Sequence, residues 1–386
     1  MLCRHHLCRP LLWLQVCLLP LAAGADAPLP PILQGEIDHA RFTIARPAVP
    51  WNGRLLLHAH GYRSPEAPRV ADLSVEHAAY ATLLDEGWVV ATTSYRRNGM
   101  ILGDAMRDLD ALREHIVKTL GEPSLVILEG ESMGGAIVTL LAERGTGSYQ
   151  GAVAIGAALQ AREDNGVGGV ALQPKVPIVF LTNQSEMEGP KHYVNQASTE
   201  ARLNPSLVAP VLFKVSRNGH VNVNQAERLV ALRALVSWIE HGRDTLPKPN
   251  SLSVDGSTVY GSDQVFDATV TPPPQPTRVT FDADGRGFTA TVTEISAIYG
   301  NAFVDAQTAD FEKAGISPGS YFKLTVGDQT FRVRYGRGFD SVPRGQWVMF
   351  PNADGFFWLA RNYQNAAETA GLTTGGKVHL SRYTQP

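Results

Sequence analysis

The clearest chemical signal in the sequence is the run Gly-Glu-Ser-Met-Gly-Gly at residues 130–135. It follows a strand-like segment at 125–129 and precedes a helix-like one, so Ser132 is predicted to lie on a sharp turn between the two. The small residues Gly130 and Gly134 leave room for the crossing backbone at such a turn. The N–H groups that begin the helix favour negative charge beside the serine hydroxyl. This arrangement predicts a serine nucleophile for acyl transfer.

The elements that must position this serine alternate along the first two thirds of the chain. Short apolar runs alternate with helix-like stretches, which is typical of an α/β fold with a mostly parallel sheet and helices on both faces. The predicted strands cover residues 37–45, 54–59, 88–94, 125–129, 152–157, 178–181 and 211–215, and the predicted helices cover 72–86, 103–120, 135–144 and 222–241.

The serine motif in this setting resembles the nucleophile elbow of the α/β-hydrolase superfamily, and its sequence is similar to that of monoglyceride-lipase-like esterases. The resemblance covers about residues 37–241. The runs Trp51-Asn52-Gly53 and His60-Gly61-Tyr62 also resemble a group of secreted bacterial hydrolases. No large cap is expected over the site, because the stretch 159–175, where many lipases insert one, is short and glycine-rich.

The resemblance implies that a catalytic acid and then a catalytic histidine follow the serine along the chain. Four histidines come after Ser132, namely His192, His220, His241 and His379. His220 follows the last predicted strand of the sheet and directly precedes a helix, which is the position expected of the base. It would remove the proton of the serine and return it to the leaving group.

The acid is expected in the loop after the predicted strand 178–181. Counting about five residues beyond that strand, as the superfamily does, selects Glu186, and Glu188 is the alternative. A glutamate can replace the commoner aspartate, because the acid only orients the imidazole and stabilises its charged form.

Two backbone N–H groups are expected to hold the oxyanion of the tetrahedral intermediate. One belongs to Met133, the residue after the nucleophile. By position in the superfamily, the other belongs to Tyr62 in the turn after the third predicted strand, where Gly61 lets the backbone come close. For His58 and His60 we expect structural roles, since a backbone donor needs no particular side chain.

The domain boundaries follow from composition. We expect a catalytic domain over residues 30–245, a proline-rich linker over 246–277, and a smaller β-rich domain over 278–386. The last segment, with Tyr299-Gly300-Asn301 and Gly315-Ile316-Ser317-Pro318-Gly319, resembles the C-terminal domain of S-adenosylmethionine hydroxide adenosyltransferases. The chain lacks the N-terminal domain of that family, so S-adenosylmethionine chemistry is not implied. We expect this domain to support assembly, substrate positioning or attachment.

The N-terminus has the pattern of a secretory signal. Arg4 and Arg9 precede an apolar run at 11–23 that ends in small residues, which predicts a cleaved signal over residues 1–25. The mature protein is then secreted or periplasmic, with no membrane attachment. All three cysteines, Cys3, Cys8 and Cys17, lie in the signal, so neither a disulfide nor thiolate chemistry is expected.

With 34 basic and 37 acidic residues the chain has a formal net charge of −3, which gives no reason to expect a nucleic-acid partner. The residues favour a secreted carboxylic-ester hydrolase with a Ser132-His220-Glu186 triad, an acyl-enzyme intermediate, no metal and no cofactor. The expected partner is a small-molecule or polymer-borne ester. A secreted serine peptidase of the same fold and a non-catalytic binding protein are the alternatives. The sequence specifies neither the acyl and alcohol groups nor the oligomeric state.

Overall fold

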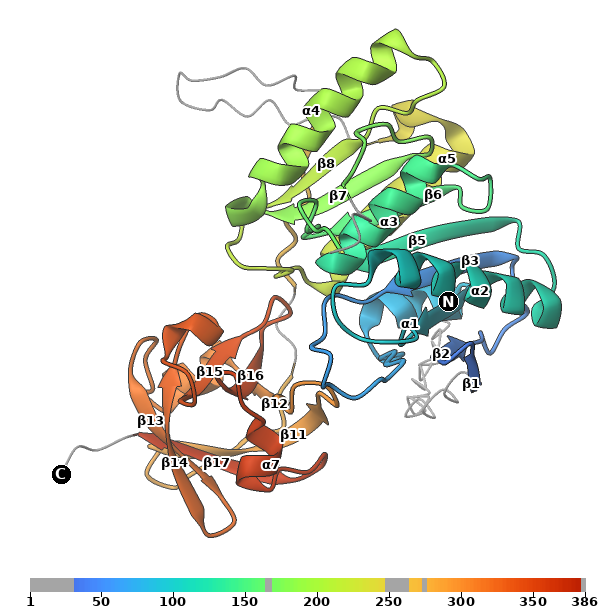
Figure 1. Cartoon of the computed structure of the whole chain (residues 1–386). Helices are drawn as coiled ribbons and strands as arrows, with labels where there is room; N and C mark the ends of the chain where they lie inside the picture. Colours follow the sequence, from blue (N-terminus) through green and yellow to red (C-terminus); the bar gives the residue numbers. More distant parts are fainter. Residues whose placement is uncertain (1–30, 164–168, 247–263, 273–275, 383–386) are drawn as a thin grey trace, which may run out of the picture.

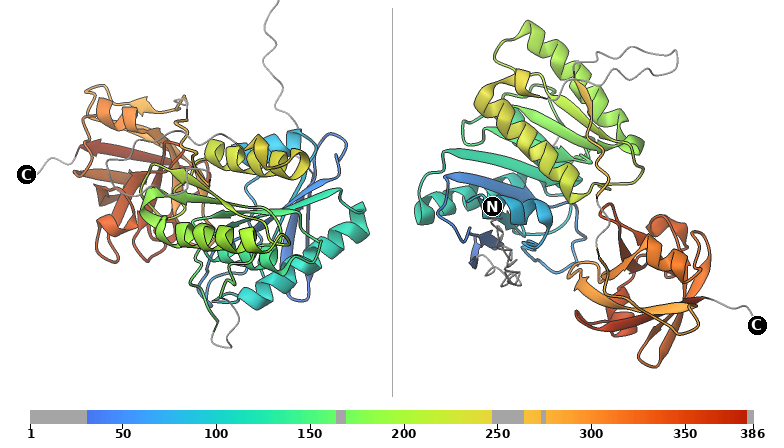
Figure 2. Two further views of the ribbon diagram at one scale, coloured as in Figure 1. Left: turned by 90° about the horizontal axis from the view of Figure 1, so that it is seen from above. Right: turned by 180° about the vertical axis from the view of Figure 1, so that it is seen from behind.

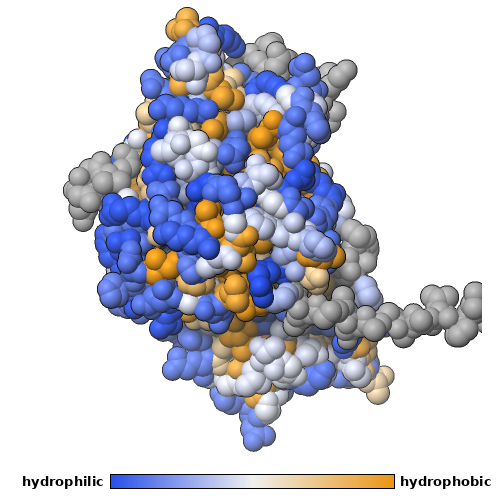
Figure 3. Space-filling model, turned by 90° about the vertical axis from the view of Figure 1, so that its right-hand side faces the viewer, coloured by the Kyte–Doolittle hydropathy of each residue, from blue (hydrophilic) through white to orange (hydrophobic). Residues whose placement is uncertain are grey.

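The computed structural model describes residues 31–163, 169–246, 264–272 and 276–382. They form two β-sheets, one covered by helices and one largely closed on itself (Figure 1). The predicted signal at residues 1–25 lies outside the described residues. No helix in the described part of the chain has the length and apolar content needed to cross a membrane. Figure 3 shows a side of the molecule on which hydrophilic residues are widespread and apolar residues gather near the middle.

The first sheet has nine strands among the described residues, in the order β1-β2-β4-β3-β5-β6-β7-β8-β9. Strands β1 and β2 are antiparallel to their neighbours, and from β4 to β9 all pairs are parallel. The strands are β1 (Ile32–Ile37), β2 (Ala40–Ala45), β3 (Arg54–Ala59), β4 (Val89–Thr93), β5 (Leu125–Glu131), β6 (Gly151–Ile155), β7 (Ile178–Asn183), β8 (Val211–Val215) and β9 (Val265–Asp267).

Helices cover both faces of this sheet (Figure 2). One face packs against α2 (Leu102–Leu120), α3 (Met133–Arg144) and α4 (Glu188–Leu203), and the other against α1 (Ala78–Asp85) and α5 (Gln225–His241). Helix α2 illustrates how a helix of this layer packs on the sheet. Its buried residues recur every three to four positions and so form one apolar stripe. The prediction of an α/β fold with helices on both faces is confirmed.

Some element boundaries differ from the predictions. The single strand predicted over residues 37–45 is wrong, because Asp38 and His39 have positive φ angles of 46° and 69° and reverse the chain between β1 and β2. Asp and Asn tolerate this conformation better than most residues, but Asp-His is a weak hairpin signal. Helix α4 was not predicted. Helix α1 begins at Ala78, later than the predicted start at residue 72.

The predicted linker, residues 246–277, contains part of the first sheet. Strand β9 pairs in parallel with β8, and Phe266 is buried with its ring 5.3 Å from that of Phe213. The apolar pair Val265-Phe266 explains the strand, because a polar linker would gain nothing from this burial.

Within the ranges that the structure describes, the second sheet has eight strands in the order β10-β11-β12-β16-β15-β14-β13-β17, and the pairing of β11 with β17 closes it like a barrel. Its core gathers around Phe311, whose ring stacks on that of Phe357 at 4.1 Å. The strands are β10 (Thr280–Phe281), β11 (Gly287–Ile295), β12 (Ala302–Gln307), β13 (Tyr321–Val326), β14 (Gln329–Tyr335), β15 (Trp347–Pro351), β16 (Phe356–Arg361) and β17 (Lys377–Arg382), with the short helices α6 (Thr308–Lys313) and α7 (Ala366–Ala370).

Candidate active site

Ser132 lies on the turn between β5 and α3, with φ of 55° and ψ of −115°. This backbone conformation is strained for a residue with a side chain. Both neighbouring glycines are required by space: a Cβ on Gly130 would lie 2.2 Å from the Gly134 oxygen, and a Cβ on Gly134 would lie 1.9 Å from the Ala59 oxygen. The turn therefore holds the serine side chain beyond the end of the sheet, at the N-terminus of α3.

His220 and Glu186 meet this serine from two other loops. The Ser132 Oγ lies 2.8 Å from His220 Nε2, and the carboxylate of Glu186 forms a short hydrogen bond with His220 Nδ1. This hydrogen bond raises the pKa of His220 above its ordinary value, against the opposing effect of partial burial. The carboxylate that contacts the imidazole belongs to Glu186. Glu188, the alternative acid, is the first residue of α4.

The loop that carries His220 is tied to the end of β7. Asn183, the last residue of that strand, donates from its side chain to the Asn222 carbonyl and accepts from the Asn222 N–H, both at 2.8 Å. Two residues later Asn224 caps helix α5, with reciprocal hydrogen bonds to Glu227. These contacts fix both ends of the short segment that follows the imidazole. The sequence alone identified none of these three asparagines as part of the site.

The turn after β3 passes directly beside the serine. A Cβ on Gly61 would lie 3.3 Å from the Cβ of Ser132, which is tighter than most Cβ contacts, so glycine favours this close approach. No hydrogen bond to a described residue occupies the amide of Tyr62 or of Met133. Both predicted oxyanion donors thus belong to segments that flank Ser132.

His60 and Tyr95 support this turn from below. The His60 ring lies 4.0 Å from that of Tyr95, and its Nδ1 is 2.7 Å from the Gly61 carbonyl oxygen, to which it donates. Burial, with a smaller effect of the Arg63 charge, lowers the pKa of His60 to about 3, so the ring is neutral. The role of His60 in the structure is to orient the turn.

Comparison with known proteins gives two family matches. Residues 99–204, which include Ser132 and Glu186, match the family model described as serine aminopeptidase, S33. Together with the sheet order and the turn at Ser132, this match identifies the fold of the first domain. The first domain has the α/β-hydrolase fold. The match supports a serine hydrolase. Residues 296–379 match the C-terminal domain of SAM hydroxide adenosyltransferases, in line with the resemblance seen in the sequence.

Solved structures similar to this chain include α/β-hydrolases and one protein without an assigned activity. They are an uncharacterized conserved protein from Thermotoga maritima (17% identity, TM-score 0.24, 31% of this chain and 45% of that one), dipeptidyl peptidase 4 from Porphyromonas gingivalis (15%, 0.40, 51% and 33%) and Est1E from Butyrivibrio proteoclasticus (12%, 0.35, 55% and 96%). The chain thus spans less than half the length of the first two. A search of curated proteins found no match.

Beneath the elbow of the α/β-hydrolase domain lies a buried cluster of charges. Arg228 on α5 forms short ion pairs with both Glu129 and Glu131, the latter being the residue before the serine. Glu129 also accepts from Tyr80 at 2.6 Å and lies 3.0 Å from Nδ1 of His58. The cluster therefore connects β3, β5, α1 and α5 at the level of the nucleophile.

Arg228 determines the charge state of this cluster. Burial alone would raise the pKa of Glu129, but the Arg228 charge, together with hydrogen bonds from His58 and Tyr80, lowers it to about 2. Glu129 is thus ionised in a site that excludes water. The buried carboxylate is stable there only because the Arg228 guanidinium balances its charge.

The site lies at the surface of the α/β-hydrolase domain. The His220 side chain is 59% exposed. Between β6 and β7, where a cap was not expected, the described residues 156–163 and 169–177 form no helix. In the described ranges no group of three or more His, Cys, Asp or Glu side chains is arranged to hold a metal ion.

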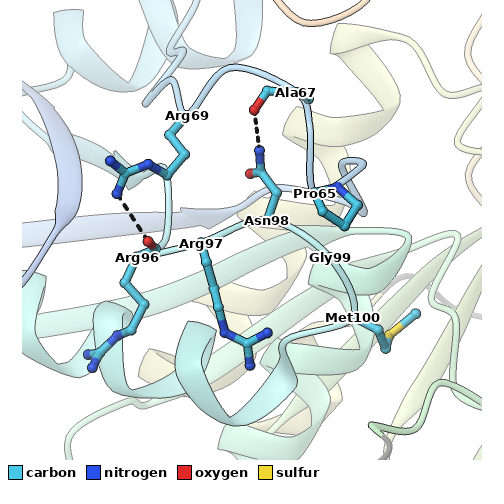
Figure 4. Close-up of a pocket in the computed structure, with 8 residues that line it drawn as sticks. All are labelled: Pro65, Ala67, Arg69, Arg96, Arg97, Asn98, Gly99 and Met100. Atoms are coloured by element: carbon cyan, nitrogen blue, oxygen red, sulfur yellow. Dashed lines mark hydrogen bonds between the residues drawn. The ribbon is translucent and has the colours of Figure 1, made fainter.

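A cavity of about 620 Å³ lies between the loops after β3 and β4 (Figure 4), and its lining residue Gly99 donates to the carbonyl of Arg63, the residue after Tyr62. Half of its lining residues are polar, namely Arg69, Arg96, Arg97 and Asn98, and the other half are Pro65, Ala67, Gly99 and Met100. The Arg69 guanidinium donates to the Arg96 carbonyl at 3.0 Å, and the Asn98 amide donates to the Ala67 carbonyl at 2.7 Å. The two loops are therefore held together by hydrogen bonds.

Replacing Arg228 with Met should destabilise the protein by about 3–5 kcal/mol, because Glu129 would be left buried without a counter-charge. Urea unfolding followed by tryptophan fluorescence measures the change. The matched control is Arg233→Met on the same helix, whose exposed ion pair with Glu86 should contribute less than about 1 kcal/mol. Adding Glu129→Gln to Arg228→Met should restore part of the loss. Equal costs for the two arginine variants would contradict this assignment.

Proposed function

We propose that this protein is an exported serine hydrolase that cleaves carboxylic esters through an acyl-enzyme. The observation that carries the proposal is the chain of hydrogen bonds from Ser132 through His220 to Glu186. An uncharged serine is a weak nucleophile, and an imidazole at 2.8 Å that a carboxylate holds in the right tautomer is what activates it. Export rests on the predicted signal at residues 1–25.

The chemistry follows from these positions. His220 takes the Ser132 proton as the Oγ attacks the ester carbonyl, and the amides of Tyr62 and Met133 donate to the oxyanion that forms. The imidazolium then protonates the leaving alcohol as the C–O bond breaks. A water molecule, deprotonated by the same imidazole, attacks the acyl-enzyme and releases the acid. Glu186 stabilises the imidazolium in both halves of the reaction.

The surroundings favour some esters over others. The exposed His220 and the uncapped approach suit a bulky or polymer-borne substrate. The cavity between the loops after β3 and β4 has three arginines and an asparagine among its eight lining residues, so, as the site for the acyl group, it suits an acid with polar groups better than a long alkyl chain. A peptidase is the second candidate, because the matched family is described as an aminopeptidase.

A fluorophosphonate probe should label the protein at Ser132, since the probe reacts only with an activated serine. Mass spectrometry of the labelled peptide identifies the residue. Ser132→Ala should abolish labelling, whereas Ser206→Ala, at an exposed serine before β8, should leave it unchanged. An intact protein that no probe labels would instead support the binding-protein alternative.

A substrate panel separates esterase from peptidase. We expect p-nitrophenyl esters of short acids and esters of hydroxycinnamates to be hydrolysed with higher kcat/KM than long-chain p-nitrophenyl esters, because a long alkyl chain in this cavity would displace water from three arginines. Peptide p-nitroanilides measured beside them should react more slowly. The opposite order between esters and amides would replace our proposal with the peptidase.

The pH dependence tests the acid. Because Glu186 raises the pKa of His220, the neutral base should appear only above the ordinary histidine pKa, so kcat/KM should rise with pH through an acid limb above about 6.5. Glu186→Gln should move this limb to lower pH and reduce kcat by about 10²- to 10⁴-fold. Glu188→Gln serves as the control and should change neither. A limb that stays in place in Glu186→Gln would rule out this acid.

A further inference from the structure

The second domain contacts the hydrolase domain at several segments, one of which is the oxyanion turn. The Tyr299 hydroxyl donates to the Tyr62 carbonyl at 3.1 Å. Asp354 accepts from the N–H of Gln225, the first residue of α5, at 3.0 Å. A third contact joins Glu294 to the loop before α1. Figures 1 and 2 show the β11–β12 end of the barrel beside that loop.

The contact of Tyr299 falls on the oxyanion turn itself. Three successive carbonyls of this turn each accept a hydrogen bond: His60 from the Tyr95 hydroxyl at 3.1 Å, Gly61 from the His60 imidazole at 2.7 Å, and Tyr62 from the Tyr299 hydroxyl at 3.1 Å. In a trans peptide the C=O and N–H lie in one plane and point in opposite directions. The Tyr62 N–H lies in the same peptide plane as the Gly61 carbonyl, which His60 holds directly. The Tyr95 and Tyr299 hydroxyls hold the peptide planes before and after it and so limit how far this plane can rotate.

The loop that presents Tyr299 is itself rigidly held. The Gly300 N–H donates to the Ser296 carbonyl at 2.8 Å, and the Gly300 carbonyl accepts from Ala367 at 2.8 Å. Gly300 has a φ of 64°, and a Cβ there would lie 1.9 Å from the Asn365 side chain. Partial burial raises the pKa of Tyr299, so its hydroxyl keeps the proton that it donates.

We propose that the second domain completes the active site: Tyr299 is a positioning residue that holds the oxyanion turn through the Tyr62 carbonyl. This inference rests on the proposed function. Tyr95 holds one side of the turn from within the hydrolase domain, and Tyr299 holds the other from outside it. Removing either hydroxyl frees a peptide plane next to that of the Tyr62 N–H, so this donor is aimed less precisely, and this weakens binding of the transition state more than binding of the substrate.

Tyr299→Phe tests the proposal, because it removes the hydroxyl and keeps the ring. We expect kcat for the best ester of the panel to fall about 5- to 10-fold with KM nearly unchanged, and the rate of fluorophosphonate labelling at Ser132 to fall similarly. Tyr95→Phe should act in the same way. Tyr363→Phe, at an exposed tyrosine of the second domain, is the control and should behave as wild type. Thermal unfolding of each variant checks that the fold is kept.

The outcomes separate the two proposals. If the wild-type protein is not labelled, the hydrolase function fails and the inference fails with it. If the wild type is labelled and Tyr299→Phe reacts within twofold of its rate, the hydrolase function stands and the role of Tyr299 is overturned. A fall in stability without a change in kcat would also overturn it, because that result describes a contact that only joins the domains.

Discussion

The backbone crosses itself most closely where β5 turns into α3, and the candidate site depends on this crossing. Gly134 packs against the Ala59 carbonyl at the end of β3, and Gly130 packs against Gly134, at distances that no side chain could tolerate. The same crossing forces Ser132 into a strained conformation and places the turn after β3 beside it. Strain of this kind persists only when the surrounding structure determines the conformation from several sides.

The structure around this turn includes a buried cluster of charged residues, Arg228, Glu129 and Glu131. Arg228 links the strand below the serine to the helix that follows His220, so two segments of the site share one cation. A buried ion pair adds little net stability compared with apolar packing, but it is very sensitive to the loss of one partner. It therefore specifies the relative position of β5 and α5 more than it strengthens the fold.

The local parts of this site were predictable, and the distant contacts were not. Ser132 lies in a motif whose glycines indicate a tight turn. His220 and Glu186 each follow a strand of the parallel sheet, and the order of these strands implies that their loops meet. The structure brings these three side chains together, while their catalytic roles stay proposals. Tyr95 and Tyr299 act on carbonyls far along the chain, and no local pattern encodes such a contact. Arg228 offered a signal that was missed, since it is a charge on the apolar side of a helix.

Strand β9 changes how the second domain is attached. Beyond this strand, the chain stays bound to the hydrolase domain as far as Val270, which hydrogen-bonds with Glu227 and Asn224, and it is bound to the barrel again at Thr277. The seven steps between these anchor points reach at most about 25 Å. If the contact between Tyr299 and Tyr62 opens, the two domains therefore stay close to each other. The contact then re-forms within one molecule, at a rate independent of protein concentration.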